Sequence, residues 1–135
     1  MATESSVTTN RDARDEMMLD RSVIAEFRTG NAGGVPDFAV VLIDQFIEEA
    51  EGQVAAIGQA AERHDVRALK ALGHSLRGSS SMLGARRLAA WCGQLEAAAE
   101  QDAAAMIDAV ASEIDGEFVK VRCALNAERQ GIGIE

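Results

Sequence analysis

Residues 107–125 read IDAVASEIDGEFVKVRCAL, and this stretch carries the clearest periodicity of the chain. Its apolar positions follow one another at intervals of 4, 3, 4, 3 and 4 residues: Ile107, Ala111, Ile114, Phe118, Val121 and Leu125. This spacing places all of them on one stripe of an α-helix, the kind of seam by which helices pack in bundles and coiled coils. We therefore expect a long amphipathic helix that packs against other helices.

Three further amphipathic helices are expected before this one. The first begins at Pro36, which suits a first helical turn, and ends at a turn at residues 63–65. The second continues from that turn to a break near Gly84, and the third from there to a break at residues 101–102. Asp65 can cap the second of them. A shorter helix around residues 19–27 ends at Gly30. Short connections make neighbouring helices antiparallel, so the sequence predicts an all-α, up-down-up-down four-helix bundle with a short extra N-terminal helix.

Length and composition agree with this architecture. The chain has 135 residues, enough for one domain with a single core, and it is rich in hydrophobic residues (47%) but poor in aromatic ones (4%). We expect residues 1–16 to form a disordered tail, residues 17–129 the bundle, and residues 130–135 a frayed C-terminus. The two cysteines, Cys92 and Cys123, show no metal-binding or disulfide spacing and are expected to be core thiols in a reducing compartment.

The absence of a targeting segment and the distribution of charge limit the classes of function that the sequence allows. No signal or transmembrane segment is evident, so we expect a cytoplasmic protein without membrane insertion. The formal net charge of −9 argues against nucleic acid as a partner. Between Arg63 and Arg87, however, six basic residues face one acidic residue, a balance of +5, whereas the rest of the chain carries −14. Such a local concentration of positive charge attracts an anion or an acidic protein surface, although a solvated basic face is the ordinary explanation.

A histidine lies within this basic segment, in the stretch GHSLRGSSSMLG of residues 73–84. At 100° per residue, Leu69, Leu72, Leu76 and Leu83 share one side of the helix, and His74 lies about 180° from that side. An exposed imidazole is therefore predicted, against the alternative of a buried core histidine. A Gly- and Ser-rich loop is a second alternative, but the leucine period continues through the segment.

The neighbours of His74 on the helix are chemically informative. Arg77, three residues on, can place a guanidinium beside an anion carried by the imidazole. Gly78, four residues on, costs about 1 kcal/mol of helix stability relative to alanine, and it removes the side chain that would stand next to the ring. Gly73 and the serines that follow weaken the helix further. A conflict between local propensity and fold is expected where another protein must approach closely.

These residues resemble the signature of the histidine-containing phosphotransfer (HPt) domain of multistep two-component phosphorelays. The resemblance covers about residues 19–127 and is carried by His74-Ser75-Leu76-Arg77-Gly78-Ser79-Ser80, Gly84-Ala85, Leu88, Cys92 and Leu95-Glu96. It departs from the family at Arg77, where lysine is commoner, so that a planar fork replaces a point charge.

The resemblance implies a four-helix bundle and a carrier role. His74 would accept a phosphoryl group from the phospho-aspartate of one receiver domain and pass it to an aspartate of another response regulator. Receiver domains and a hybrid histidine kinase would be its partners, and Mg²⁺ would belong to the receiver. No cofactor, no metal site and no ATP-dependent kinase activity are expected of this chain.

The resemblance also implies roles around the histidine. Arg77 and Gly78 would serve the transferred group, and Glu96 would accept a hydrogen bond from the imidazole, unless it is an ordinary surface carboxylate. The expected surface for receiver docking comprises Arg67, Lys70, Ser81, Met82 and Gly84. Met82, Leu83 and residues 17–19 could all lie near the histidine as a docking rim, but a place in the core or in a loose tail fits their sequence equally well. His64 is expected to be a surface residue, and Trp91 and Cys92 to contribute to packing.

Two rival functions remain open at this point. One is a non-catalytic helical adaptor that binds a receiver or a histidine kinase without phosphotransfer. The other is a general helical interaction module unrelated to signalling. The presence of His74 disfavours the adaptor.

Overall fold

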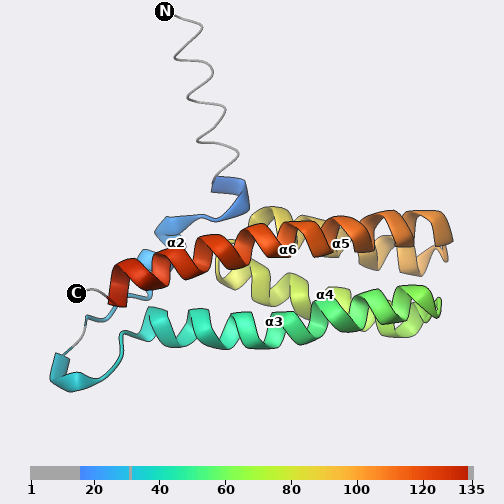
Figure 1. Ribbon diagram of the computed structural model, residues 1–135. Coiled ribbons are helices and arrows are strands. Elements are labelled where there is room, and N and C mark those ends of the chain that lie inside the picture. The colour runs from blue at the N-terminus through green and yellow to red at the C-terminus, as the bar shows by residue number, and fades with distance from the viewer. Residues whose placement is uncertain (1–15, 31, 134–135) are drawn as a thin grey trace, which may run out of the picture.

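The computed structural model describes residues 16–30 and 32–133, and every regular element in these ranges is a helix. Four long helices lie side by side with alternating directions (Figure 1): α3 (Phe38–Glu62), α4 (Val66–Met82), α5 (Arg86–Glu100) and α6 (Ala104–Gly133). The short helix α2 (Arg21–Glu26) and a 3₁₀ turn, η1 (Ala32–Gly34), precede them. The all-α helical bundle predicted from the sequence is confirmed.

The long helices close into a ring around one core. Each contacts the next along the chain, and α6 returns to pack against α3. Five members of the seam in α6 are buried, and the sixth, Ala111, is partly buried against them: Ile107, Ile114, Phe118, Val121 and Leu125. The interval pattern of this helix thus identified its core-facing side.

Aspartates fix the starts of two helices. Asp65 caps α4 by accepting a hydrogen bond from the backbone N–H of Ala68 at 3.2 Å, as predicted. In α3 the cap is Asp37, which accepts from the N–H of Ala39 at 3.0 Å. Pro36 therefore lies before the cap and not in the first turn, because the Asp37 carboxylate caps a helix that starts two residues later, at Phe38.

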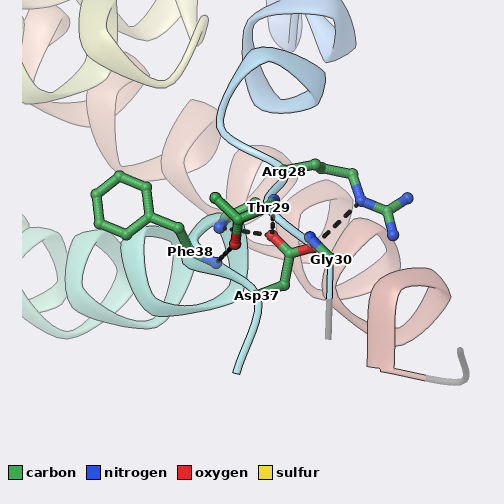
Figure 2. A network of polar contacts seen from close by, with 6 residues as sticks. Arg28, Thr29, Gly30, Asp37 and Phe38 are labelled. Carbon is green, nitrogen blue, oxygen red and sulfur yellow. Dashed lines mark hydrogen bonds and ion pairs between the residues drawn. The ribbon is translucent and has the colours of Figure 1, made fainter. Parts of the chain in front are cut away.

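The carboxylate of Asp37 also holds the preceding loop against α3 (Figure 2). It accepts hydrogen bonds from the backbone N–H groups of Thr29 (3.1 Å) and Gly30 (2.9 Å), and the Arg28 Nε lies 3.6 Å away. The Thr29 hydroxyl in turn accepts from the N–H of Phe38. Asp37 is only 3% exposed, so this carboxylate is sheltered from water, and its hydrogen bonds tie the N-terminal segment to the bundle.

The opposite end of the bundle is closed by a contact between two turns. His64 follows α3, Asp102 follows α5, and both have a backbone φ of 54°. The His64 Nε2 lies 2.7 Å from Oδ1 of Asp102. His64 is a surface residue, as expected, and it also links the α3–α4 turn to the α5–α6 turn.

Several expectations from the sequence differ from the structure. Helix α6 continues through residues 130–133, where fraying was expected, because Ile132 is buried against the core. Cys123 is exposed and is not a core thiol, because the core side of this turn is taken by Val121 and Leu125. Of the tail expected over residues 1–16, residues 1–15 lie outside the described residues, as do residues 134–135, whereas Glu16 belongs to a helical turn over residues 16–18. Within residues 16–30 and 32–133, no helix has the length and hydrophobicity that crossing a membrane would require.

Candidate functional site

His74 lies in the middle of α4 and points away from the core. Its side chain is 72% exposed, whereas Leu69 and Leu76 on the opposite side of the helix are fully buried. The helix is continuous from Val66 to Met82, so the Gly- and Ser-rich segment is not a loop. The exposed position derived from the leucine period agrees with the structure.

Glu96 reaches this imidazole from the neighbouring helix α5. Its Oε2 lies 3.4 Å from the His74 Nδ1, and its side chain is only 17% exposed. Arg77 completes a triangle: its Nη2 lies 3.4 Å from the same Nδ1, and its Nε lies 3.2 Å from Oε1 of Glu96. The guanidinium therefore holds the carboxylate in place beside the ring.

The triangle places an acceptor and a donor at the same distance from Nδ1 of the imidazole. A carboxylate can only accept a hydrogen bond, so Glu96 favours a proton on Nδ1, whereas the Arg77 guanidinium can only donate and favours an unprotonated Nδ1. Nε2 of His74 has no hydrogen-bond or ion-pair partner among the described residues. With the proton on Nδ1, Nε2 keeps its lone pair and is the ring nitrogen available to a reaction partner.

A glycine on α5 that no sequence motif marks shapes the position of Arg77. A Cβ on Gly93 of α5 would lie 3.6 Å from the Cδ of Arg77 and 3.7 Å from its Nη1. The arginine side chain thus lies directly over the bare backbone of α5. Only the pairing of two helices reveals this contact, so no pattern along the sequence could have found it.

The two glycines near His74 have different functions in the structure. Gly73 is buried, and a Cβ there would lie 3.2 Å from both the Cys92 carbonyl oxygen and the Cγ of Glu96. It therefore allows α4 and α5 to approach closely, which brings Glu96 to the histidine. A Cβ on Gly78 would meet no atom within 4 Å, so this glycine leaves the surface beside His74 open.

On the other side of His74, α3 contributes polar contacts that the sequence did not predict. Gln53 donates a hydrogen bond of 2.8 Å from Nε2 to the Ser75 hydroxyl. Ser79 donates from its hydroxyl to the Ser75 carbonyl at 3.1 Å. These contacts fix the α3-facing side of α4 within one turn of the histidine.

A groove lies between α3 and the C-terminal half of α4. It has a volume of about 290 Å³ and is mostly apolar. Its lining comprises Leu42, Gln45, Phe46, Glu49, Ser79, Met82 and Leu83. Met82 is 57% exposed, so it is available to a partner, as a docking residue must be. Ser79 and Met82 follow His74 by five and eight residues, about 8 and 12 Å along the helix axis.

The remaining residues expected to dock a receiver divide into two groups. Arg67, Lys70 and Ser81 are exposed on α4, and the Lys70 Nζ lies 3.5 Å from Oε1 of Glu100. Gly84 is buried and does not belong to an open surface. Its φ is +79°, its carbonyl accepts from the Asp20 N–H at 2.9 Å, and a Cβ would meet the Asp20 carbonyl oxygen at 2.8 Å. Gly84 is thus required by the turn and by the N-terminal segment that covers it.

The buried residues next to the site on α5 contribute to packing and not to its chemistry. Cys92 is fully buried, and burial, together with the nearby Glu96 carboxylate, raises the pKa of its thiol to about 12. Trp91 packs partly buried against the core, as expected. The described residues hold no group of three or more His, Cys, Asp or Glu side chains placed to bind a metal ion.

Comparisons with known proteins converge on one family. The family model described as "Hpt domain" matches residues 41–122. Multistep phosphorelay regulator 1 of Schizosaccharomyces pombe is 28% identical over 83 residues, which cover 62% of this chain and 28% of that relative. The chain therefore spans under a third of that protein's length. The crystal structure of histidine-containing phosphotransfer protein B from Pseudomonas aeruginosa matches with a TM-score of 0.73 and 31% identity, over 84% of this chain and 95% of that one.

Proposed function

Because the chain belongs to the Hpt domain family and has a histidine phosphotransfer role in phosphorelays, we propose that His74 is the residue that carries the phosphoryl group. In this proposal it receives the group from the phospho-aspartate of one receiver domain. It then passes the group to an aspartate of a second receiver domain. Receiver domains and a hybrid histidine kinase are the partners.

One observation carries the proposal: an imidazole that is 72% exposed and whose Nδ1 alone faces a carboxylate. A phosphoryl acceptor needs an accessible nucleophile with a free lone pair, and Nε2 of His74 meets both requirements when the proton is on Nδ1. The contacts of 3.4 Å at Nδ1 are long for hydrogen bonds, as is common in sites before a partner closes over them.

The transfer balances without any further reactant. The lone pair of Nε2 attacks the phosphorus atom, an N–P bond forms, and the bond from phosphorus to the aspartyl oxygen breaks, with its electron pair leaving on the carboxylate. The proton stays on Nδ1. The phosphorylated ring then carries positive charge, which the Glu96 carboxylate stabilises. The second transfer is the same step in the opposite direction.

Two residues serve the transferred group in this proposal. The Arg77 guanidinium lies within 3.4 Å of the ring, and its charge offsets that of the phosphoryl oxygens. The bare backbone at Gly78 lets a receiver approach the ring without a steric barrier. Mg²⁺ belongs to the receiver, where it neutralises charge on the phosphoryl group during transfer.

The groove beside α3 is the proposed docking surface for the receiver. Its apolar lining fits an apolar side chain of the partner, while Arg67, Lys70 and Ser81 surround the histidine with polar groups. An apolar centre with a polar rim is the usual composition of a transient protein interface.

The test is transfer of a radiolabelled phosphoryl group from a purified receiver domain to this protein. We expect label that is labile in acid and stable in base, as a phosphoramidate is, and no label on the His74→Gln variant. The chain contains two histidines, so His64→Gln is a matched control and must accept label as the wild type does. Receiver binding without transfer would replace the proposal with an adaptor function, and neither binding nor transfer would refute both.

A further inference from the structure

The two helices beside the proposed docking surface carry opposite charges. Between Phe38 and Glu62, α3 has five acidic residues and no basic one. Between Val66 and Met82, α4 has three basic residues, Arg67, Lys70 and Arg77, and no acidic one. The helices lie next to each other (Figure 1), so the surface from His74 to the groove has basic residues on its α4 side and the acidic Glu49 on its α3 side.

A row of polar side chains marks the acidic side of this surface. Gln45, Glu49 and Gln53 recur every four residues and so lie on one face of α3, the face toward α4. Gln53 bonds to Ser75 beside the histidine, and Gln45 lies in the groove with its Nε2 3.4 Å from Oε1 of Glu49. Among the residues that line the groove, only Glu49 is charged.

Glu49 differs from Asp44 and Glu51 in its partners. It differs in its place on the groove from Glu48 and Glu62, which are equally unpaired within the part of the chain that the structure describes. Asp44 pairs with Arg129, and Glu51 with Arg122, both on α6. Glu49 is exposed and has no cationic partner among the described residues, only the Gln45 amide. A carboxylate at the edge of an apolar groove is therefore free to attract a positive charge from outside the chain.

We propose that Glu49 selects among receiver domains by pairing with a lysine or arginine beside the apolar side chain that enters the groove. The inference rests on the proposed function, because the receiver is the partner that must reach His74. The phosphorylated face of a receiver is anionic and is drawn to Arg67, Lys70 and Arg77. A cation at Glu49 gives the same receiver a second point of attachment of opposite sign, which fixes its orientation.

The inference also explains how a receiver can be rejected. A receiver with an acidic residue at the position facing Glu49 is repelled, whereas its apolar contact with the groove is unchanged. Rim charges of this kind act mainly on the association rate and on its salt dependence. Selection by Glu49 is therefore expected in kcat/KM for transfer rather than in the rate within the complex.

The experiment compares Glu49→Lys with Glu48→Lys in transfer from a panel of radiolabelled receiver domains. Glu48 is exposed on the same helix and does not line the groove, so its substitution makes the same change in net charge. For the receiver with the fastest transfer, we expect Glu49→Lys to lower kcat/KM about tenfold at low ionic strength and Glu48→Lys less than about twofold. The difference should disappear at about 0.5 M salt.

A charge exchange identifies the partner residue. Each exposed lysine and arginine on the docking face of that receiver is changed to glutamate, and one such variant should restore transfer with Glu49→Lys to within about threefold of the original pair. Equal effects of the Glu49 and Glu48 substitutions, or the absence of any restoring variant, would overturn the inference alone. If no receiver labels the wild-type chain, the proposed function fails, and this inference fails with it.

Discussion

Oε2 of Glu96 lies 3.4 Å from Nδ1 of His74, so a carboxylate on α5 faces the imidazole nitrogen whose protonation leaves Nε2 free to react. Substitution of Glu96 by alanine removes the acceptor and also leaves Arg77 without its anchor. We expect transfer to His74 to slow by about tenfold to a hundredfold, the range found for residues that orient metal-binding histidines. Glu96→Gln keeps an acceptor oxygen but loses the charge that stabilises the phosphorylated ring, so its rate should lie between those of Glu96→Ala and the wild type.

Ring ¹⁵N chemical shifts supply an independent measurement for Glu96. The wild type and Glu96→Gln should show the tautomer with its proton on Nδ1, and Glu96→Ala should show a larger share of the other tautomer. Unchanged tautomers and equal transfer rates in all three proteins would show that Glu96 is an ordinary surface carboxylate.

Gly73 and Gly78 form a natural pair for a stability test. Gly78→Ala should stabilise the protein by about 0.5–1 kcal/mol, because the new methyl group meets open space and alanine favours helix. Gly73→Ala should destabilise it by about 1–3 kcal/mol, because its Cβ would lie 3.2 Å from the rigid carbonyl of Cys92. Urea unfolding measures both, and changes of the same sign would contradict the close approach of α4 and α5.

A longer side chain at Gly78 separates function from stability. Gly78→Gln should fold as the wild type does and accept the phosphoryl group more slowly, since the side chain stands where the receiver approaches. An unaltered rate would mean that the open surface at Gly78 is not needed for approach.

Asp37 should make folding sensitive to acid. Burial by itself raises the pKa of this carboxyl, but the backbone donors of Ala39, Thr29 and Gly30 outweigh it, so the pKa lies below its ordinary value of 3.8. A lowered folded-state pKa stabilises the protein above pH 3.8 and loses this effect as the pH falls through the folded-state value. At pH 7, Asp37→Asn should lower the melting temperature by about 5 °C relative to the wild type. As the pH falls through the folded-state pKa of Asp37, the difference between the two melting temperatures should shrink. A constant difference at every pH would exclude this role.

The two thiols should react at very different rates. Burial raises the pKa of Cys92 to about 12, so almost none of it is thiolate under mildly alkaline conditions, whereas Cys123 is exposed. Iodoacetamide should therefore modify one thiol per native chain quickly, and both thiols in denaturant. Peptide mapping should locate the fast thiol at Cys123, and rapid modification of Cys92 in the native protein would contradict its burial.

The sequence predicted those features that depend on one helix at a time. The seam from Ile107 to Leu125 and the outward position of His74 both follow from the period of a single helix, and both agree with the structure. The expected burial of Cys123 failed for a related reason. Val121, Cys123 and Leu125 lie close together on α6, but the core side of the helix accommodates only Val121 and Leu125. Only the packing of the helices shows that Cys123 is the residue exposed to solvent.

The features that the sequence did not predict belong to pairs of helices or segments. Gly93 matters because Arg77 of another helix lies on it, and Gln53 because Ser75 faces it. The sequence places Gly84 on the docking surface, but Asp20 covers it, a contact between segments 64 residues apart. Residue spacing along one chain segment carries no information about such neighbours.

A single nitrogen on one face of the bundle has a kinetic consequence in the proposed relay. The donor receiver and the acceptor receiver must bind the same surface one after the other. Plots of reciprocal transfer rate against reciprocal acceptor concentration, at several fixed donor concentrations, should therefore give parallel lines. Either partner in large excess would then occupy the carrier unproductively and shut out the other. Throughput should pass through a maximum as one partner is raised, which makes the ratio of the two partners a control variable of the pathway.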